Sequence, residues 1–415
     1  MSTPGDTLAI DGGSPVRTTP LPGKDRLMGQ DEIDELTEVI QSGQLGRHGG
    51  TKVKALERAF AERYGVKHAI AVSSGSAADH TAIAMIDPEP GDEIVTTPCT
   101  DFGGVLGILF QNAIPVFADL DPDTLCLDPA SVDAKITPRT RAILATHLFG
   151  GLADMDALNA IGERHGIPVI EDCAQAQLAE LGGRLGGTMG TIGCFSFNNT
   201  KHLNCGEGGM VVTNDDALAR RGRLFADKAW PREEDERYSL FLGQNYRLNE
   251  LEGAVALVGL RRLDENVAAR RRAVERIYER IAGVPGVSIP AALPGARSSY
   301  WILHLFVDQG IDPDRVAAAL AAEGIPFSAR YVTPLYTWPA LRDANTYGRS
   351  RFPFDSPYTD RAFDYAPGLC PVFEARREQL ILLPVDEQWT DADADDIAAA
   401  VRKVMPRVLP ADTGA

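Results

Sequence analysis

The stretch RAILATHLFGGLADMDALNAIGERHGIPVIEDC, residues 141–173, contains two short apolar runs on either side of an amphipathic segment. The apolar runs, at 141–147 and 168–173, are predicted to be strands, because each is short, apolar and bounded by turn-forming residues. The segment 154–166 is predicted to be a helix, with Asp154 as its N-cap and Gly166 as its stop signal. Strand, helix and strand in this order predict two neighbouring parallel strands.

The same alternation continues on both sides of this stretch. Strands are expected at 68–72, 92–97, 115–120, 193–198 and 208–214, and helices at 73–86, 103–112, 130–136, 215–228 and 249–283. Residues 30–65 have a helical pattern that is broken by the Gly-rich stretch SGQLGRHGG. The alternation predicts an α/β fold built on a mainly parallel, doubly wound sheet.

The chain divides into three parts on the basis of these patterns. Residues 1–25 are expected to form an irregular N-terminal arm, 26–260 a large domain, and 261–415 a smaller C-terminal α+β domain. Within the last part, YWILHLFVD resembles a strand, and DPDRVAAALAAEG and DADADDIAAAVRKVM resemble helices. The stretch 333–370, rich in Pro, Tyr and Asp, is expected to form loops or lids.

The composition excludes several classes of function. Among 415 residues, 41 are Lys or Arg and 58 are Asp or Glu, which gives a net charge of −17 and no overall attraction to nucleic acid or anionic membranes. No apolar run reaches the roughly 18 residues of a membrane helix, and the first residues lack the features of a secretory signal. The six cysteines show no metal-binding spacing. We therefore expect a cytoplasmic protein without a metal, whose thiols are reduced and mostly buried.

Three polar features lie at or near the ends of predicted strands, where open parallel sheets bind ligands. The first is Ser74-Gly75-Ser76, which follows the strand 68–72 and opens a helix. Small residues at a helix N-terminus allow backbone N–H groups to approach a phosphate. The alternative is a plain Ser N-cap with a Gly turn.

The second feature is the acidic pair Glu171-Asp172 at the end of the strand 168–173. Such a pair could bind a metal, act as a base, or pair with a cationic heterocycle, and an Asp here could keep a pyridine nitrogen protonated. The alternative is an Asp that caps the following turn.

The third feature is Lys201, which lies in the polar loop between the strands 193–198 and 208–214. A lysine that forms an imine must be partly desolvated, whereas a lone lysine is more often a solvated surface charge. Together the three features describe a phosphate cradle, a partner for a ring nitrogen, and a reactive amine.

Four segments carry a resemblance to a known family: AVSSGSAADH (71–80), VIEDCAQA (169–176), SFNNTKHLNCGEGGMVVTND (196–215) and LGQNYRLNELEGAVAL (242–257). In this order they resemble the DegT/DnrJ/EryC1/StrS family of sugar and cyclitol aminotransferases, which depend on pyridoxal 5'-phosphate (PLP). The resemblance implies a fold-type-I PLP enzyme, like aspartate aminotransferase, that works as a homodimer with shared active sites.

The resemblance also implies roles for individual residues. By position, Lys201 is the Schiff-base lysine and Asp172 binds the pyridinium nitrogen; these two are the expected catalytic residues. The other expected cofactor contacts are Gln175 to the phenolic oxygen, Gly75, Ser76 and Ser196 to the phosphate, Phe102 to the ring face, and Asn245 to the phosphate in the neighbouring subunit. The sequence departs from the family at Ser76 and Asp101, where Thr is common, and at 177–180, where Gln-Leu-Ala-Glu replaces a Gly-containing run.

The implied activity is transfer of an amino group from glutamate or glutamine to a keto sugar or keto cyclitol, in secondary-metabolite or sugar biosynthesis. The substrates are small molecules, and no nucleic acid or membrane partner is expected. Alternatives on the same fold are a dehydratase, a lyase that uses a mobile thiol such as Cys370, and a non-catalytic regulator. Related dehydratases carry His in place of the lysine, so Lys201 favours transamination.

Overall fold

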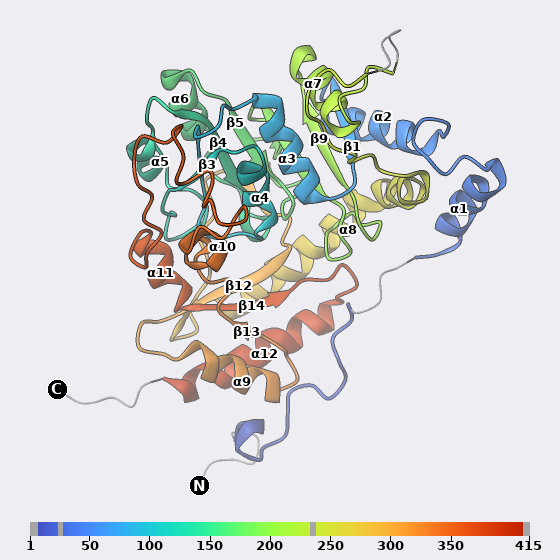
Figure 1. Ribbon diagram of the computed structural model, residues 1–415. Coiled ribbons are helices and arrows are strands. Elements are labelled where there is room, and N and C mark those ends of the chain that lie inside the picture. The colour runs from blue at the N-terminus through green and yellow to red at the C-terminus, as the bar shows by residue number, and fades with distance from the viewer. Residues whose placement is uncertain (1–6, 24–27, 233–237, 410–415) are drawn as a thin grey trace.

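The computed structural model describes residues 7–23, 28–232 and 238–409. Its centre is a seven-stranded sheet in the order β1-β9-β8-β5-β4-β2-β3 (Figure 1). The strands are β1 (His68–Val72), β2 (Glu93–Thr96), β3 (Ile114–Phe117), β4 (Thr140–Thr146), β5 (Val169–Asp172), β8 (Ile192–Ser196) and β9 (Gly209–Thr213). Neighbouring strands pair in parallel except at β9, which is antiparallel to both β1 and β8. The prediction of a mainly parallel α/β sheet is confirmed.

Helices cover both faces of this sheet. They are α1 (Gln30–Ser42), α2 (Lys52–Tyr64), α3 (Gly75–Ile86), α4 (Gly103–Phe110), α5 (Pro129–Lys135), α6 (Met155–His165), α7 (Asp216–Ala226) and α8 (Glu250–Ile281). Side chains alternate across a pleated strand, so Ala69 and Ala71 of β1 pack towards α2 and α8, whereas Ile70 and Val72 pack towards α3. The apolar strands are therefore buried on both sides, as is typical of doubly wound sheets.

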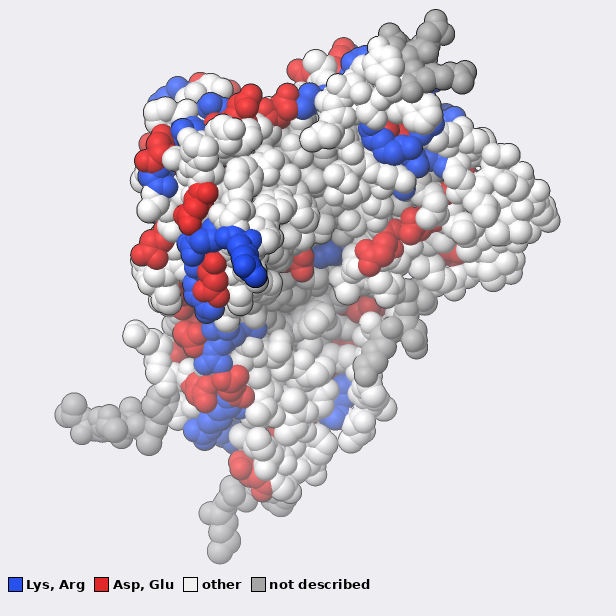
Figure 2. All heavy atoms as spheres, in the orientation of Figure 1, with Lys and Arg blue, Asp and Glu red and all other residues white. Residues whose placement is uncertain are grey.

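A second, smaller sheet lies below the first in Figure 1 and is reached through the long helix α8. Its order is β10-β12-β14-β13, formed by β10 (Val287–Ser288), β12 (Ile302–Val307), β13 (Ser328–Ala329) and β14 (Leu380–Pro384). Helices α9 (Pro313–Ala322) and α12 (Asp391–Val408) pack beside it and share its hydrophobic core. The space-filling view is hollowed between these two parts of the molecule (Figure 2).

The described part of the N-terminal arm, 7–23, is irregular apart from a 3₁₀ turn at Ala9–Asp11. Leu8 joins the core of the smaller sheet, and the carboxylate of Glu323 accepts the backbone N–H groups of Ala9 and Val16. The arm is thus held by the C-terminal third of the chain, although it lies at the other end of the sequence.

Three features of the chain differ from the sequence predictions. The strand expected at 115–120 ends at Phe117, because the carboxylate of Asp119 turns away to accept the N–H groups of Val372 and Phe373. These N–H groups begin α11 (Pro371–Arg377). A three-stranded sheet, β11-β6-β7, was not predicted, since its strands are only two residues long: β6 (Glu180–Leu181), β7 (Arg184–Leu185) and β11 (Ala296–Arg297).

The third difference concerns the stretch 333–370, which was expected to form loops or lids. It contains a 3₁₀ turn at Leu335–Thr337 and the short helix α10 (Pro339–Arg342), and is otherwise irregular. Its aromatic side chains Tyr336, Phe354 and Tyr365 are buried in the core beneath β3 and β4. The stretch is therefore mostly loop, as expected, but its buried aromatic side chains make it part of the core and not a lid. None of the described helices is both long and apolar enough to cross a membrane.

A buried ion pair joins α8 to the smaller sheet. The guanidinium of Arg270, 1% exposed, donates to Glu387 at 2.6 Å and to the carbonyl of Val385 at 2.7 Å. Arg270→Met leaves the Glu387 carboxylate buried without this partner, and we expect it to lower the free energy of unfolding by about 3–5 kcal/mol. Chemical denaturation provides the measurement. The control is Arg63→Met, which removes an exposed pair with Asp264 and should change stability by about 1 kcal/mol or less. Equal losses in the two variants would contradict this reasoning.

Candidate active site

Three parallel strands bring polar side chains to one edge of the large sheet. Thr146 ends β4, Asp172 ends β5 and Ser196 ends β8, and Thr146 and Asp172 are paired in register. The carboxyl ends of parallel strands form the ligand-binding edge in open α/β sheets. The sheet topology therefore gathers residues that are up to 50 positions apart in the sequence.

Asp172 is buried at this edge, with 3% of its surface exposed. One carboxylate oxygen accepts the N–H of Ala174 at 2.9 Å, and the other accepts the hydroxyl of Thr146 at 3.2 Å. Burial raises the pKa of Asp172, while the N–H of Ala174, the charge of Lys201 and the Thr146 hydroxyl act to lower it. These partners stabilise the ionised carboxylate.

Lys201 lies between β8 and β9, and only 9% of its surface is exposed. Its Nζ is 3.8 Å from the centre of the Trp301 ring, and the Trp301 indole is held by a 2.8 Å hydrogen bond to the carbonyl of Thr200. Burial lowers the pKa of Lys201 to about 8, although the nearby carboxyl groups of Asp172, Asp101 and Asp79 act to raise it. An amine in this range is partly neutral at physiological pH, as imine formation requires. The alternative of a solvated surface charge is thus excluded.

The start of α3 forms a close cradle with β8. The side chain of Ser74 caps the helix by accepting the N–H of Ala77 at 3.0 Å. A Cβ on Gly75 would lie 2.7 Å from the Cβ of Ser196, so only glycine permits this approach. The helix N-terminus and the Ser196 hydroxyl therefore face each other without an intervening side chain. This arrangement suits a phosphate group, and Ser76 lies in the same first turn.

Gln175 follows Asp172 by three residues, and Phe102 precedes α4, whose Gly104 lies near the Asp172 carboxylate. Gln175 is 2% exposed, and its carbonyl oxygen accepts the N–H of Phe149 at 2.9 Å, which fixes the orientation of its amide. Phe102 stands at the N-cap of α4 and stacks on Trp338, with ring centroids 5.3 Å apart. The side-chain amide of Gln175 and the ring of Phe102 are therefore held in place by protein contacts.

Asn245 occupies a different position from the other predicted site residues. It is exposed on the segment that runs past the end of β1, where Ser73 donates to the carbonyl of Tyr246 at 2.8 Å. An exposed position suits a contact to a second subunit. The cofactor roles of Asn245 and of the other seven residues stay predictions at this point.

A buried network beneath Asp172 was only partly expected from the sequence. The carboxylate of Glu171 is fully buried and accepts four N–H groups, from the backbone of Gly187, Met189 and Gly190 and from His147 Nε2. The N–H of Ala153 donates to His147 Nδ1 at 3.1 Å, which places the imidazole proton on Nε2. The backbone N–H of His147 in turn donates to the carbonyl of Asp172. The ends of β4 and β5 are thus locked together.

The side chains of His147, Glu171 and Cys173 lie close enough to share a metal ion. However, both oxygens of Glu171 and both nitrogens of His147 already make hydrogen bonds. Burial also raises the pKa of the Cys173 thiol well above its usual value, so the thiolate that a metal requires is disfavoured. This group is therefore better explained as a structural network.

Two further site residues were missed by sequence reasoning. Trp301 was placed in a strand without a role, because nothing in the sequence relates it to Lys201, 100 residues earlier. Asp79 is a single acid within the apolar helix SGSAADHTAIAMI, and that incongruity could have drawn attention to it. Asp79 is 4% exposed and faces the Asp172 side of the sheet.

The thiols offer no reactive nucleophile. All six cysteines are free, and all but Cys205 are buried, which confirms the expectation of mostly buried thiols. Cys370, the candidate for lyase chemistry, has no exposed surface, and burial raises the pKa of its thiol to about 12. Cys370 is therefore not a mobile nucleophile.

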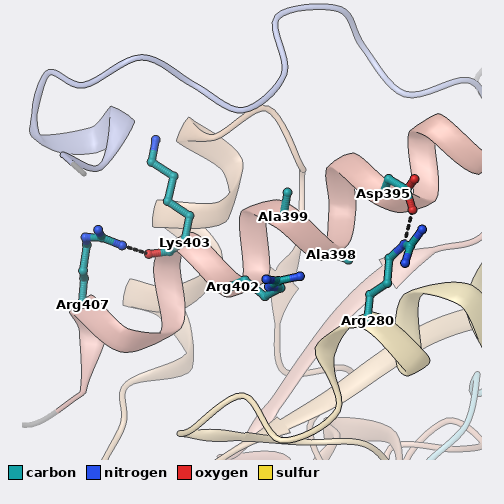
Figure 3. A pocket seen from close by; sticks show the side chains of 7 residues that line it. All are labelled: Arg280, Asp395, Ala398, Ala399, Arg402, Lys403 and Arg407. Atoms are coloured by element: carbon teal, nitrogen blue, oxygen red, sulfur yellow. Dashed lines mark hydrogen bonds and ion pairs between the residues drawn. The ribbon is translucent and has the colours of Figure 1, made fainter. Parts of the chain in front are cut away.

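A second hollow, of about 570 Å³, lies on α12 and the end of α8 (Figure 3). It is lined by Arg280, Asp395, Ala398, Ala399, Arg402, Lys403 and Arg407. In Figure 3, Arg280 turns to Asp395, and Arg407 reaches back to the carbonyl of Lys403. Lys403 also bonds the arm through the carbonyl of Ser14 and pairs with Glu323. The contacts of Lys403 hold the N-terminal arm to α12. We therefore assign the residues of this hollow a structural role and not a catalytic one.

The lowered pKa of Lys201 leads to a labelling experiment. A neutral amine attacks formaldehyde, so reductive methylation of Lys201 should rise through a midpoint near pH 8 and then level off. Ordinary exposed lysines, with pKa values of about 10.4, continue to rise in reactivity to higher pH. Mass spectrometry of the labelled peptides gives both curves from one sample. A midpoint for Lys201 at or above that of the exposed lysines would contradict the effect of burial.

Comparison with known proteins agrees with this geometry. A model of the DegT/DnrJ/EryC1/StrS aminotransferase family matches residues 26–362. The chain is 37% identical to L-glutamine:2-deoxy-scyllo-inosose aminotransferase of Streptoalloteichus tenebrarius, over 96% of this chain and 97% of that protein. It is 34% identical to GDP-perosamine synthase of Caulobacter vibrioides, over 91% of this chain and 95% of that protein.

A solved structure shows the same architecture. The aminotransferase TlmJ from Streptoalloteichus hindustanus superposes with a TM-score of 0.79 at 30% identity, covering 92% of this chain and 97% of that one. The match extends over both the large sheet with Lys201 and the smaller sheet. The chain therefore belongs to the DegT/DnrJ/EryC1/StrS family of aminotransferases, and it is a transaminase of fold type I.

Proposed function

We propose that this enzyme binds PLP at Lys201 and transfers an amino group from L-glutamine to a keto cyclitol. The observation that carries the proposal is the buried amine of Lys201, whose pKa is lowered to about 8 and which is attracted by the carboxylate of Asp172. A desolvated lysine beside a stabilised carboxylate is the pair of groups that a pyridine aldehyde cofactor requires.

The residues of the site fit each part of this cofactor. Gly75 allows the N-terminus of α3 to approach Ser196 closely, so the backbone N–H groups of this turn and the hydroxyls of Ser76 and Ser196 could contact one phosphate. Asp172 would accept a hydrogen bond from the protonated ring nitrogen, and Gln175 would donate its amide N–H to the phenolic oxygen. Phe102 would pack against the ring.

The chain's own groups then provide the proton transfer. When bound, PLP supplies an electron sink for the C–H bond of the amino donor. The neutral Nζ of Lys201 accepts the proton from the α-carbon of the donor, and later returns a proton to the carbon of the keto acceptor. Asp172 keeps the ring nitrogen protonated during both steps. The buried setting of Lys201 and Asp172 strengthens their attraction, since water screens it poorly there.

The choice of glutamine and a keto cyclitol follows from the named relatives. Full-length similarity at 37% identity to an enzyme named for L-glutamine and 2-deoxy-scyllo-inosose supports this pair. A nucleotide-linked keto sugar is the second candidate, because GDP-perosamine synthase is 34% identical. Lyase chemistry has little support, since Cys370 is buried, and a purely regulatory role leaves the lowered pKa of Lys201 without a purpose.

The proposal is tested by replacing Lys201. Lys201→Ala should lower the rate of amino transfer from glutamine by roughly 10²–10⁴-fold, because the proton acceptor is lost. It should also abolish the near-visible absorbance band that glutamine bleaches in the unaltered protein. Lys67→Ala, which alters an exposed lysine paired with Asp216, is the matched control and should leave both unchanged. A band that no amino donor bleaches would contradict transamination.

The acceptor is identified with the same assay. The protein is first treated with glutamine until its near-visible absorbance band is bleached. It is then mixed with 2-deoxy-scyllo-inosose or with a GDP-linked 4-keto sugar, and the rate at which the band returns is measured. Faster return with the cyclitol supports the proposal, and faster return with the nucleotide sugar moves the assignment to the second candidate.

We further propose that two copies of the chain form a dimer that shares its active sites. Leu242 is 95% exposed and Tyr238 is 62% exposed, and both lie within seven residues of Asn245. Exposed apolar side chains on one segment are typical of a surface that a partner covers. A second copy bound there would bring Asn245 towards the partner's phosphate site.

Leu242→Asp tests the dimer. A charge at this position should weaken association, because it would have to be buried at the contact between the two copies. PLP should also be retained less well, because Asn245 would no longer reach the partner's phosphate site. Sedimentation velocity and cofactor absorbance are measured together. Tyr358→Asp alters an aromatic residue that is 53% exposed elsewhere and serves as the control. A native protein that is monomeric and fully loaded would overturn the shared site.

A further inference from the structure

Asp79 is a buried carboxyl group that the proposed mechanism does not use. It lies in the second turn of α3, is 4% exposed, and stands among the apolar residues of that helix. Its Oδ1 is buried, and no described residue makes a hydrogen bond to it. A buried oxygen without a partner is uncommon, since leaving one unsatisfied costs about 1–3 kcal/mol.

Asp79 and Asp172 both border one small space beside Gly104. A Cβ placed on Gly104 would lie 3.7 Å from Oδ2 of Asp172 and 3.9 Å from Oδ2 of Asp79. The two carboxyl groups therefore converge on one point, Asp172 from β5 and Asp79 from α3. Two carboxyl groups that share a buried site do not both ionise readily, because each negative charge disfavours the other.

The surroundings decide which of the two keeps its proton. Asp172 has the N–H of Ala174 and the hydroxyl of Thr146 as donors, whereas Asp79 faces the thiol of Cys194. Burial raises the pKa of Asp79 well above its usual value, and the negative charge of Asp172 raises it further. A hydrogen bond from the Cys194 thiol acts to lower the pKa of Asp79, Asp101 acts to raise it, and the charge of Lys201 acts to lower it.

We propose that Asp79 is a positioning residue of this site: it stays a neutral carboxylic acid, so that Asp172 carries the only negative charge of this pair. The protonation state of Asp79 does not depend on the proposed function. The role of Asp172 as the partner of the cofactor's ring nitrogen does depend on it. A second negative charge at Asp79 would raise the pKa of Lys201, so that its amine would become neutral and reactive only at higher pH. Asp79 thus acts through Asp172 and Lys201 and does not touch the substrate.

The protonation of Asp79 can be observed in the protein without cofactor. At pH 7 the infrared spectrum should contain the carbonyl band of a buried protonated acid, and Asp79→Asn should remove it. Asp79→Leu should remove the same band, and this second variant guards against a folding defect in the first. Thermal melting and circular dichroism confirm that each variant is folded.

The pH dependence of Lys201 labelling shows which of the two carboxyl groups, Asp79 or Asp172, is ionised. The pH midpoint of its reductive methylation should be unchanged in Asp79→Asn, because one neutral group replaces another. In Asp172→Asn the midpoint should fall by roughly one pH unit or more, because the charge that holds the lysine proton is removed. An ionised Asp79 would instead give no acid band, and Asp79→Asn would then lower the Lys201 midpoint as Asp172→Asn does.

Two results would overturn the proposal. One is the absence of an acid band that depends on Asp79. The other is a lower Lys201 midpoint in Asp79→Asn, which would show that Asp79 is ionised in the unaltered protein. Because both readouts use the unloaded protein, they stand apart from the PLP claim. Failure to form a cofactor band would count only against the proposed function.

Discussion

The buried carboxylate of Glu171 is the contact on which the geometry of the active site depends. Its four N–H donors come from the imidazole of His147 and from the backbone of residues 187–190. A charged group without exposed surface is tolerated only when it is fully hydrogen-bonded, so these segments cannot separate without a large energetic penalty. Since Asp172 is the next residue along β5, its position is fixed by the same contacts.

On this rigid edge, the electrostatics of the site result from a competition between burial and charge. Burial favours the neutral form of every titratable group, which lowers the pKa of Lys201 and raises that of Asp172 and Asp79. Local hydrogen bonds then select Asp172 as the group that can bear a charge. A reactive amine and a stable carboxylate can therefore exist side by side at neutral pH.

The smaller sheet contributes to the site as well as to stability. Trp301, at the start of β12, covers the amine of Lys201 and is held by the carbonyl of Thr200. The buried pair of Arg270 and Glu387 holds α8 to the segment after β14, so that this sheet is fixed relative to the large one. Desolvation of Lys201 is thus a consequence of how the two parts of the chain pack together.

The sequence by itself determined the sheet and most of its helices, and it singled out candidate site residues. β1 was predicted with its observed limits, and α6 with its Asp154 cap and Gly166 stop, because burial periodicity and capping are local properties. Lys201 and Asp172 were predicted as site residues from local motifs and from the family resemblance that these motifs carry. Tertiary structure alone decided that Trp301 covers Lys201, that Asp79 faces Asp172, and that Tyr336 and Tyr365 lie in the core. Periodicity shows that a side chain is buried, but only the packing of distant segments determines which other side chains it meets.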